Sequence, residues 1–115
     1  MAAGTYHMKI EKGSTLSLVL TYTDSNDAAI DLSGYAARMQ IRKRMNDSNA
    51  ILEATTENGY LTLGGSAGTV TVSIPASVTA TLDTVEAVYD IELVNGSIVT
   101  RLIEGTVEVS PEVTR

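Results

Sequence analysis

The 115-residue sequence has no cysteine, no tryptophan and no phenylalanine, and its one histidine is His7. Without cysteine, the chain has neither a disulfide bond nor a thiolate metal ligand. One histidine cannot form a histidine-rich metal site, and His7 falls in a predicted edge strand, where it is expected to be solvated. We therefore expect no metal site, no cofactor and no catalytic residue, and we predict that the protein is not an enzyme.

The loop motifs that bind ions or phosphates are incomplete in this sequence. Residues 24–26 are similar to the start of a calcium loop, but Ala29 and Tyr35 occupy the positions where that loop needs glycine and glutamate. The glycine-rich segment 64–68 is not followed by the lysine and hydroxyl residue of a phosphate-binding loop. Both segments are therefore predicted to be turns.

Long apolar runs and an excess of basic residues are also missing. No segment approaches the roughly 18 consecutive apolar residues of a membrane span, and residues 1–6 lack the basic and apolar parts of an export signal. The net charge is −6, which opposes binding to the phosphate backbone of nucleic acids. Arg38, Arg42, Lys43 and Arg44 cluster, but no aromatic residues interleave with them to stack on bases. We expect neither a nucleic-acid partner nor a membrane partner.

Most of the chain consists of short runs in which apolar and polar residues alternate. Leu16, Leu18, Leu20 and Tyr22 share one parity of their segment. Strict alternation of this kind predicts a half-buried β-strand. The same pattern recurs, with turn residues between the runs, in residues 35–44, 61–63, 70–74, 87–93 and 98–109.

One segment has a different pattern. Pro75 suits the first turn of a helix, and Val78 and Leu82 form an apolar pair four residues apart. We predict a short helical crossover there, between two sheets. About seven to eight short strands with one crossover favour an all-β fold, an immunoglobulin-like antiparallel β-sandwich. It forms a single domain over residues 1–115, with residues 1–4 as a flexible arm, and a small barrel is the alternative.

The alternation also predicts individual contacts. If residues 35–44 and 87–93 are neighbouring strands, Arg38 and Arg42 oppose Asp90 and Glu92 on the outer face. Tyr89 has the parity of the core.

Two features of the strands and turns call for local departures from a regular ladder. Arg101 and Gly105 fall on the apolar parity of the last strand, so that either a bulge near Gly105 resets the parity or Arg101 is buried against an acid. Asn58 and Gly59 predict a type I′ hairpin turn.

Three segments carry a resemblance to a known family. Residues 31–42 (DLSGYAARMQIR), 88–93 (VYDIEL) and 101–115 (RLIEGTVEVSPEVTR) together resemble small structural proteins encoded by tailed bacteriophages and prophages. The same layout, with its final Val113, Thr114 and Arg115, is similar to the N-terminal domain of phage upper-baseplate proteins. The resemblance spans roughly residues 8–115.

The resemblance implies a non-enzymatic virion protein, a docking or adaptor module of the tail, the baseplate or the fibre attachment. Its expected partners are other phage virion proteins, and it is expected to be a homo-oligomer or to be present in multiple copies. Its expected location is the virion, after synthesis in the cytoplasm of the bacterial host. A capsid decoration protein and a small carbohydrate-binding module are the alternatives.

The N-terminal segment is the candidate contact with a partner. Residues 5–10 are predicted to form an edge strand, whose unpaired N–H and C=O groups are available to a neighbouring chain. The candidate protein-interface residues are Thr5, Tyr6, His7, Met8 and Lys9.

Overall fold

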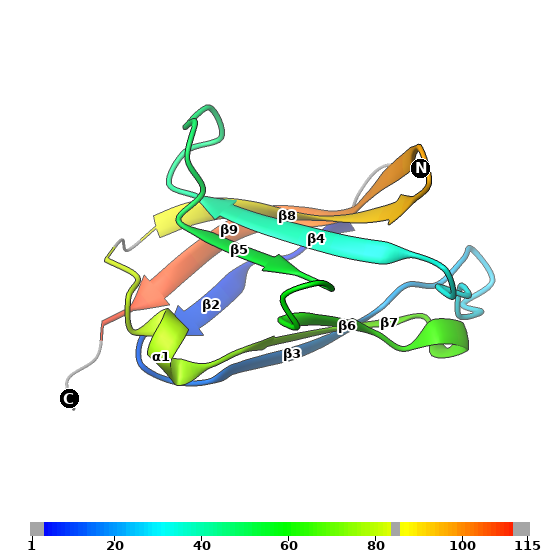
Figure 1. The fold of residues 1–115 in the computed structure, drawn as a ribbon, viewed down its shortest axis with the longest axis horizontal. Coiled ribbons are helices and arrows are strands. Elements are labelled where there is room, and N and C mark those ends of the chain that lie inside the picture. Colours follow the sequence, from blue (N-terminus) through cyan, green and yellow to red (C-terminus); the bar gives the residue numbers. More distant parts are fainter. Residues whose placement is uncertain (1–3, 84–85, 112–115) are drawn as a thin grey trace.

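The computed structural model describes residues 4–83 and 86–111, in which two β-sheets pack face to face around an aliphatic core (Figure 1). The predicted all-β sandwich is confirmed. The larger sheet contains β1 (Gly4–Thr5), β2 (Met8–Glu11), β4 (Ala36–Arg42), β5 (Leu52–Thr55), β8 (Glu86–Asn95) and β9 (Ile98–Ser110). The smaller sheet contains β3 (Leu16–Thr21), β6 (Leu61–Leu63) and β7 (Thr69–Ile74).

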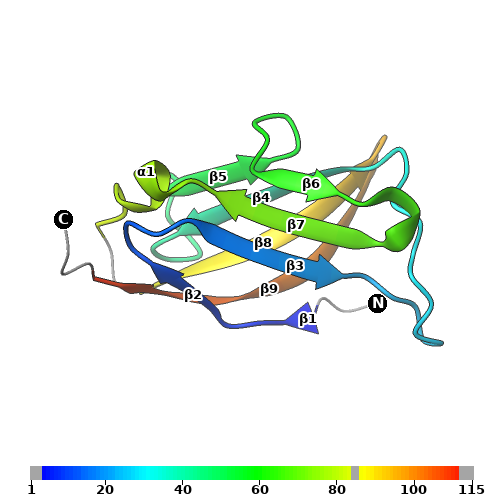
Figure 2. The same cartoon turned by 90° about the horizontal axis from the view of Figure 1, so that it is seen from below.

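The strand order is that of an immunoglobulin-like sandwich. In the smaller sheet the order β3–β7–β6 corresponds to strands B, E and D, and in the larger sheet β9–β8–β4 corresponds to G, F and C. β1 and β2 follow one another along the outer edge of β9 and run parallel to it, whereas the other pairings are antiparallel. The parallel pairing was not predicted. It arises because β2 and β9 both run toward the end of the sandwich where the chain turns into β3 (Figure 2).

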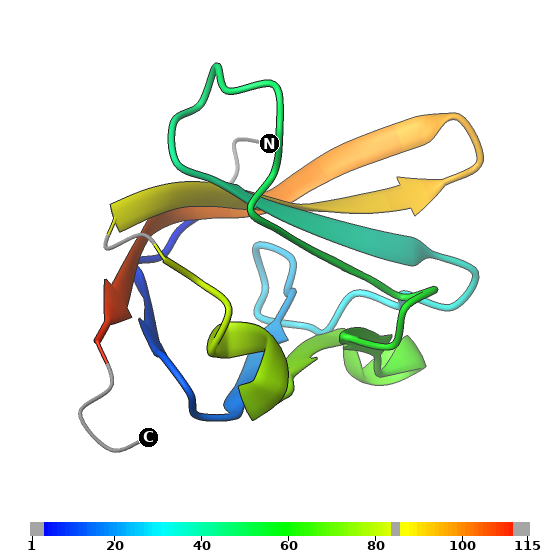
Figure 3. The same ribbon diagram turned by 60° about the vertical axis from the view of Figure 1, so that its left-hand side comes forward.

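The connections place the predicted helical crossover as expected. α1 (Ala76–Thr79) begins directly after Pro75, leads from β7 in the smaller sheet to β8 in the larger sheet, and lies at one end of the sandwich (Figure 3). The Thr79 hydroxyl donates to the Ser14 carbonyl and accepts from the Gly13 N–H. These bonds hold the β2–β3 turn against α1. The glycine-rich turn before β7 contains a 3₁₀ helix, η1 (Gly65–Ala67).

The parity of the strands matches the burial of their side chains. In β4, Ala37, Met39 and Ile41 are buried while the residues between them are not. In β8, Tyr89 is only 4% exposed, and its neighbours of the same parity are also buried. The predicted core position of Tyr89 is therefore confirmed.

β9 contains a bulge, but not at the predicted position. The β8–β9 register shifts where Arg101 opposes Glu92 and Ile103 opposes Ile91, so Leu102 is the extra residue. The shift turns Ile103 and Gly105 toward the core and leaves the Arg101 side chain 52% exposed. The bulge thus lies before Gly105, and the alternative of a buried Arg101 is wrong.

The turn at Asn58 and Gly59 joins two sheets and is not a hairpin, because β5 and β6 belong to different sheets. Gly59 has a φ of 84°, but Asn58 lacks the positive φ of a type I′ turn. Instead, the Asn58 side chain accepts from the N–H groups of Thr55 and Tyr60 and donates to the Glu53 carbonyl.

We expect Tyr89→Ala to lower the free energy of unfolding by about 3–5 kcal/mol, because it removes a buried aromatic ring from a packed core. Tyr6→Ala, at a ring that is 40% exposed, is the matched control and should cost much less. Denaturant unfolding followed by circular dichroism measures both losses. Equal stability of Tyr89→Ala and the unsubstituted chain would show that the ring adds nothing to the core.

Candidate protein-interaction surface

The N-terminal edge of the larger sheet exposes most of the candidate interface residues. Thr5, Tyr6, His7 and Lys9 are exposed along the outer edge formed by β1 and β2. Met8 is only 1% exposed and belongs to the core, so its assignment as an interface residue is corrected. The reason is the regular alternation of β2, which turns Met8 and Ile10 inward. Of the predicted arm, Gly4 lies in β1, and residues 1–3 lie outside the described residues.

The N-terminal strand keeps one register along β9 but is interrupted at Tyr6, where its backbone lies closely over Gly105. The Tyr6 N–H donates to the Glu104 carbonyl at 3.0 Å, and the Tyr89 hydroxyl donates to the Tyr6 carbonyl at 2.8 Å. Gly105 pairs with Tyr89 in the β8–β9 ladder. A Cβ atom at Gly105 would overlap the Tyr6 carbonyl oxygen and lie 2.9 Å from its carbon. This close approach therefore requires glycine at position 105.

His7 lies beside β9 on the exposed surface. Its Nδ1 is 2.6 Å from the Thr106 hydroxyl oxygen, and its Nε2 is 3.8 Å from a Glu108 carboxylate oxygen. The solvated position expected of His7 is confirmed, since its side chain is 57% exposed.

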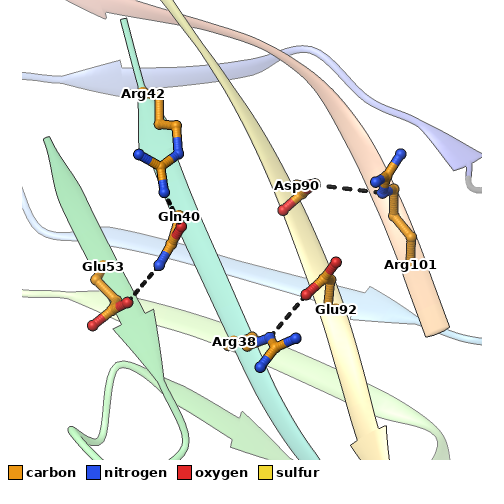
Figure 4. Close-up of polar contacts among 7 residues, drawn as sticks. All are labelled: Arg38, Gln40, Arg42, Glu53, Asp90, Glu92 and Arg101. Atoms are coloured by element: carbon orange, nitrogen blue, oxygen red, sulfur yellow. Dashed lines mark hydrogen bonds and ion pairs between the residues drawn. The ribbon is translucent and has the colours of Figure 1, made fainter. Parts of the chain in front are cut away.

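The outer face of the larger sheet carries charged and polar side chains that pair with one another on β5, β4, β8 and β9 (Figure 4). β4 and β8 are neighbours as predicted, and Arg38 Nε donates to Glu92 Oε1 at 2.8 Å. The prediction that Arg42 also opposes an acidic residue of β8 is wrong, because Arg42 opposes Val88 and Asp90 opposes Gln40. Arg42 donates to Gln40 Oε1 at 2.6 Å and to the backbone carbonyl of Asp47 at 3.0 Å.

Arg101 takes the place that Arg42 was expected to fill. Its guanidinium is 3.5 Å from Asp90 and 3.7 Å from Glu104. Burial, and then the neighbouring Glu92 carboxylate, raise the pKa of Asp90 above its usual value, while Arg101 acts in the opposite direction. Basic and acidic groups are interleaved on this face, so it functions as a salt-bridged surface and its positive charge is largely compensated.

The structure also exposes an edge that sequence reasoning missed. Within residues 4–83 and 86–111, no strand pairs with the outer edge of β3. Leu16, Leu18 and Leu20 pack against the core but remain partly exposed, and Val19 is 59% exposed on the other face. A usable signal was present, because residues 13–23 contain no charged side chain.

A groove lies at the C-terminal end of this edge, between β3 and the β1–β9 pair. It has a volume of about 320 Å³, and its apolar lining includes Leu20, Tyr22, Leu102 and Ile103. Arg101 also lines the groove, next to its acidic partners. The groove is the open side of the sandwich core.

The side chains of residues 4–83 and 86–111 include no group of three or more histidine, cysteine, aspartate or glutamate residues placed to hold a metal ion. No helix in these ranges is long and apolar enough to cross a membrane.

No protein-family model matches the chain, and no curated protein matches it.

We expect Gly105→Ala to destabilise the protein by about 1–3 kcal/mol, because the new methyl group displaces the Tyr6 backbone. The substitution should accelerate amide hydrogen exchange in β1 and β2 more than it accelerates exchange in β8. Gly4→Ala is the control, since a Cβ there meets only ordinary contacts at 3.9 Å. A Gly105→Ala protein with unchanged stability and exchange would contradict the steric requirement.

The Tyr89 hydroxyl makes stability depend on pH. Burial, and then Tyr6, raise the pKa of Tyr89 from 10.0 to about 12. Between these values the unfolded state loses the proton while the folded state keeps it, so stability falls as the pH rises. We expect the free energy of unfolding of the unsubstituted chain to exceed that of Tyr89→Phe by about 1 kcal/mol at neutral pH. We expect this difference to shrink as the pH rises past 10.0. Unfolding free energies of both proteins measured across that range check this; a difference that does not vary with pH would rule it out.

Proposed function

We propose that this chain is a non-enzymatic structural protein of a tailed-phage particle, a docking or adaptor module of the tail, the baseplate or the fibre attachment. One observation carries the proposal. The three segments that resemble phage structural proteins, residues 31–42, 88–93 and 101–115, contribute to strands that are direct neighbours, β4, β8 and β9. The resemblance therefore concerns one continuous part of the larger sheet and not scattered turns.

The arrangement of this sheet supports a docking role. β8 and β9 are its longest strands, and β4 and β9 flank β8 on both sides. Next to β9, the N-terminal strand presents Thr5, Tyr6, His7 and Lys9 on an outer edge. Such an edge is a suitable contact for the side chains of a neighbouring subunit. We propose this edge as the contact with the particle.

Neither alternative is favoured by a specific observation. A carbohydrate-binding module uses several exposed aromatic rings. Here Tyr22, Tyr35 and Tyr60 pack against the core and Tyr89 is buried, so that Tyr6 is the one exposed tyrosine among the described residues. A capsid decoration protein differs from a tail adaptor in its place in the particle, which fractionation reveals.

The location is tested by mass spectrometry of particles released from the bacterium that encodes the chain, after heads and tails are separated. The proposal predicts the protein in the tail fraction in multiple copies. Its presence in heads alone would favour the decoration protein, and its absence from both fractions would refute a virion role.

We expect Lys9→Glu to reduce incorporation into particles several-fold, because it reverses an exposed charge on the N-terminal edge while the fold is kept. Arg44→Glu, the same reversal in the exposed loop between β4 and β5, is the control and should be incorporated normally. Quantitative mass spectrometry of complemented particles measures both. If the two folded variants are incorporated equally well, the edge is not the contact.

A further inference from the structure

We propose that the free edge of β3 binds an extended segment of another protein, which is uncharged between a basic amino end and an acidic carboxyl end and adds antiparallel to β3 as a further strand of the smaller sheet. This site is distinct from the N-terminal edge, and it does not depend on the proposed function, since such an edge takes a strand in any assembly.

β3 lacks the features that protect an edge strand from pairing. Natural edges are kept free by lysine, proline, bulges or short length. β6, at the other edge of the smaller sheet, has three residues, β5 contains Glu53, and the N-terminal strand is interrupted and contains Lys9. β3 has six residues without charge, proline or a register shift. Among these edges it is the one that is built to pair.

The free hydrogen-bonding groups of β3 belong to its odd-numbered residues. The Tyr22 N–H donates to the Gly68 carbonyl on the β7 side, at 2.8 Å. Because N–H and C=O groups of successive residues in a strand point to opposite sides, Ser17, Val19 and Thr21 direct theirs away from β7. These residues offer a regular ladder to an incoming strand.

The width of the larger sheet determines what kind of partner fits. β1 and β2 lie beyond β3 on the same side of the sandwich, so that the larger sheet extends under the empty position next to β3 (Figure 2). A single strand fills this position and covers the leucines that are partly exposed. A second copy pairing through its own β3 would bring its overhanging strands into the same space. The occupant is therefore a segment and not a second copy of the domain.

Charge and shape define the chemistry of this segment. The edge is neutral between Lys12 at its start and Asp24 and Asp27 after its end. An antiparallel segment therefore carries a basic residue at its amino end, next to the aspartates, and an acidic residue at its carboxyl end, next to Lys12. The groove of about 320 Å³ accepts one large aliphatic side chain near the amino end. Arg101 at this groove is paired with Asp90 and Glu104, so it repels the basic residue only weakly.

The test uses the purified chain and a synthetic peptide that is blocked at both ends. From its amino end, the peptide consists of arginine, then three pairs of threonine and an aliphatic residue, and finally glutamate. The aliphatic residue is leucine in the first pair and valine in the other two. We expect binding in NMR titrations, with the amide signals of Ser17, Val19 and Thr21 shifting most and gaining protection from exchange. No binding at the highest soluble peptide concentration, or shifts confined to other edges, would overturn the proposal.

Two matched variants and two modified peptides complete the test. Val19→Pro removes an outward N–H but keeps the bonds to β7, and we expect at least about tenfold weaker binding. Val19→Ala keeps the N–H and should bind as before. If Val19→Pro does not fold, two peptides make the same test on the unsubstituted chain, one with N-methyl groups on its odd-numbered residues and one with N-methyl groups on its even-numbered residues. Unchanged binding of Val19→Pro, or unchanged binding of both N-methylated peptides, would contradict strand addition.

Discussion

The close approach of the Tyr6 backbone to Gly105 is the constraint on which the pairing of β1 and β2 with β9 depends. Only a residue without a side chain leaves room for the Tyr6 carbonyl there. The Tyr89 hydroxyl, reaching out of the core, satisfies that carbonyl at 2.8 Å. β1 and β2 are thereby joined into one edge along β9, with Met8 and Ile10 in the core. A part-buried hydrogen bond and the absence of a side chain at Gly105 thus act together at one point.

This arrangement gives the two sheets unequal widths. Because the N-terminal strand pairs with β9, it is not available to β3, and none of the strands in the described residues covers this edge of the smaller sheet. The same choice produces the overhang beside β3 and the groove lined by Leu20, Tyr22 and Leu102. The two surfaces that we propose as contacts are the N-terminal edge and the β3 edge. Both follow from the pairing of the N-terminal strand with β9.

Alternation in the sequence was sufficient to predict the sandwich, the crossover helix and the core position of Tyr89. It was insufficient where tertiary pairing decides the outcome. The position of the bulge at Leu102 depends on the register in which β9 pairs with β8 and turns Arg101 to solvent. The alternation of residues within β9 alone does not determine this position. Asn58 and Gly59 suggested a hairpin because local turn chemistry does not reveal that the next strand joins another sheet. The open β3 edge depends on the parallel pairing of β2, which no local pattern encodes.

A double-mutant cycle between Gly105→Ala and Tyr89→Phe tests most directly how the Tyr6 backbone is held against Gly105. If the new methyl group displaces Tyr6, the Tyr89 hydroxyl has already lost its acceptor, and its removal costs little more. We predict that the double variant is more stable than the sum of the single losses implies, by about 0.5–1.5 kcal/mol. Losses that add to within about 0.3–0.5 kcal/mol would contradict the account, because the two residues would then act on separate parts of the fold.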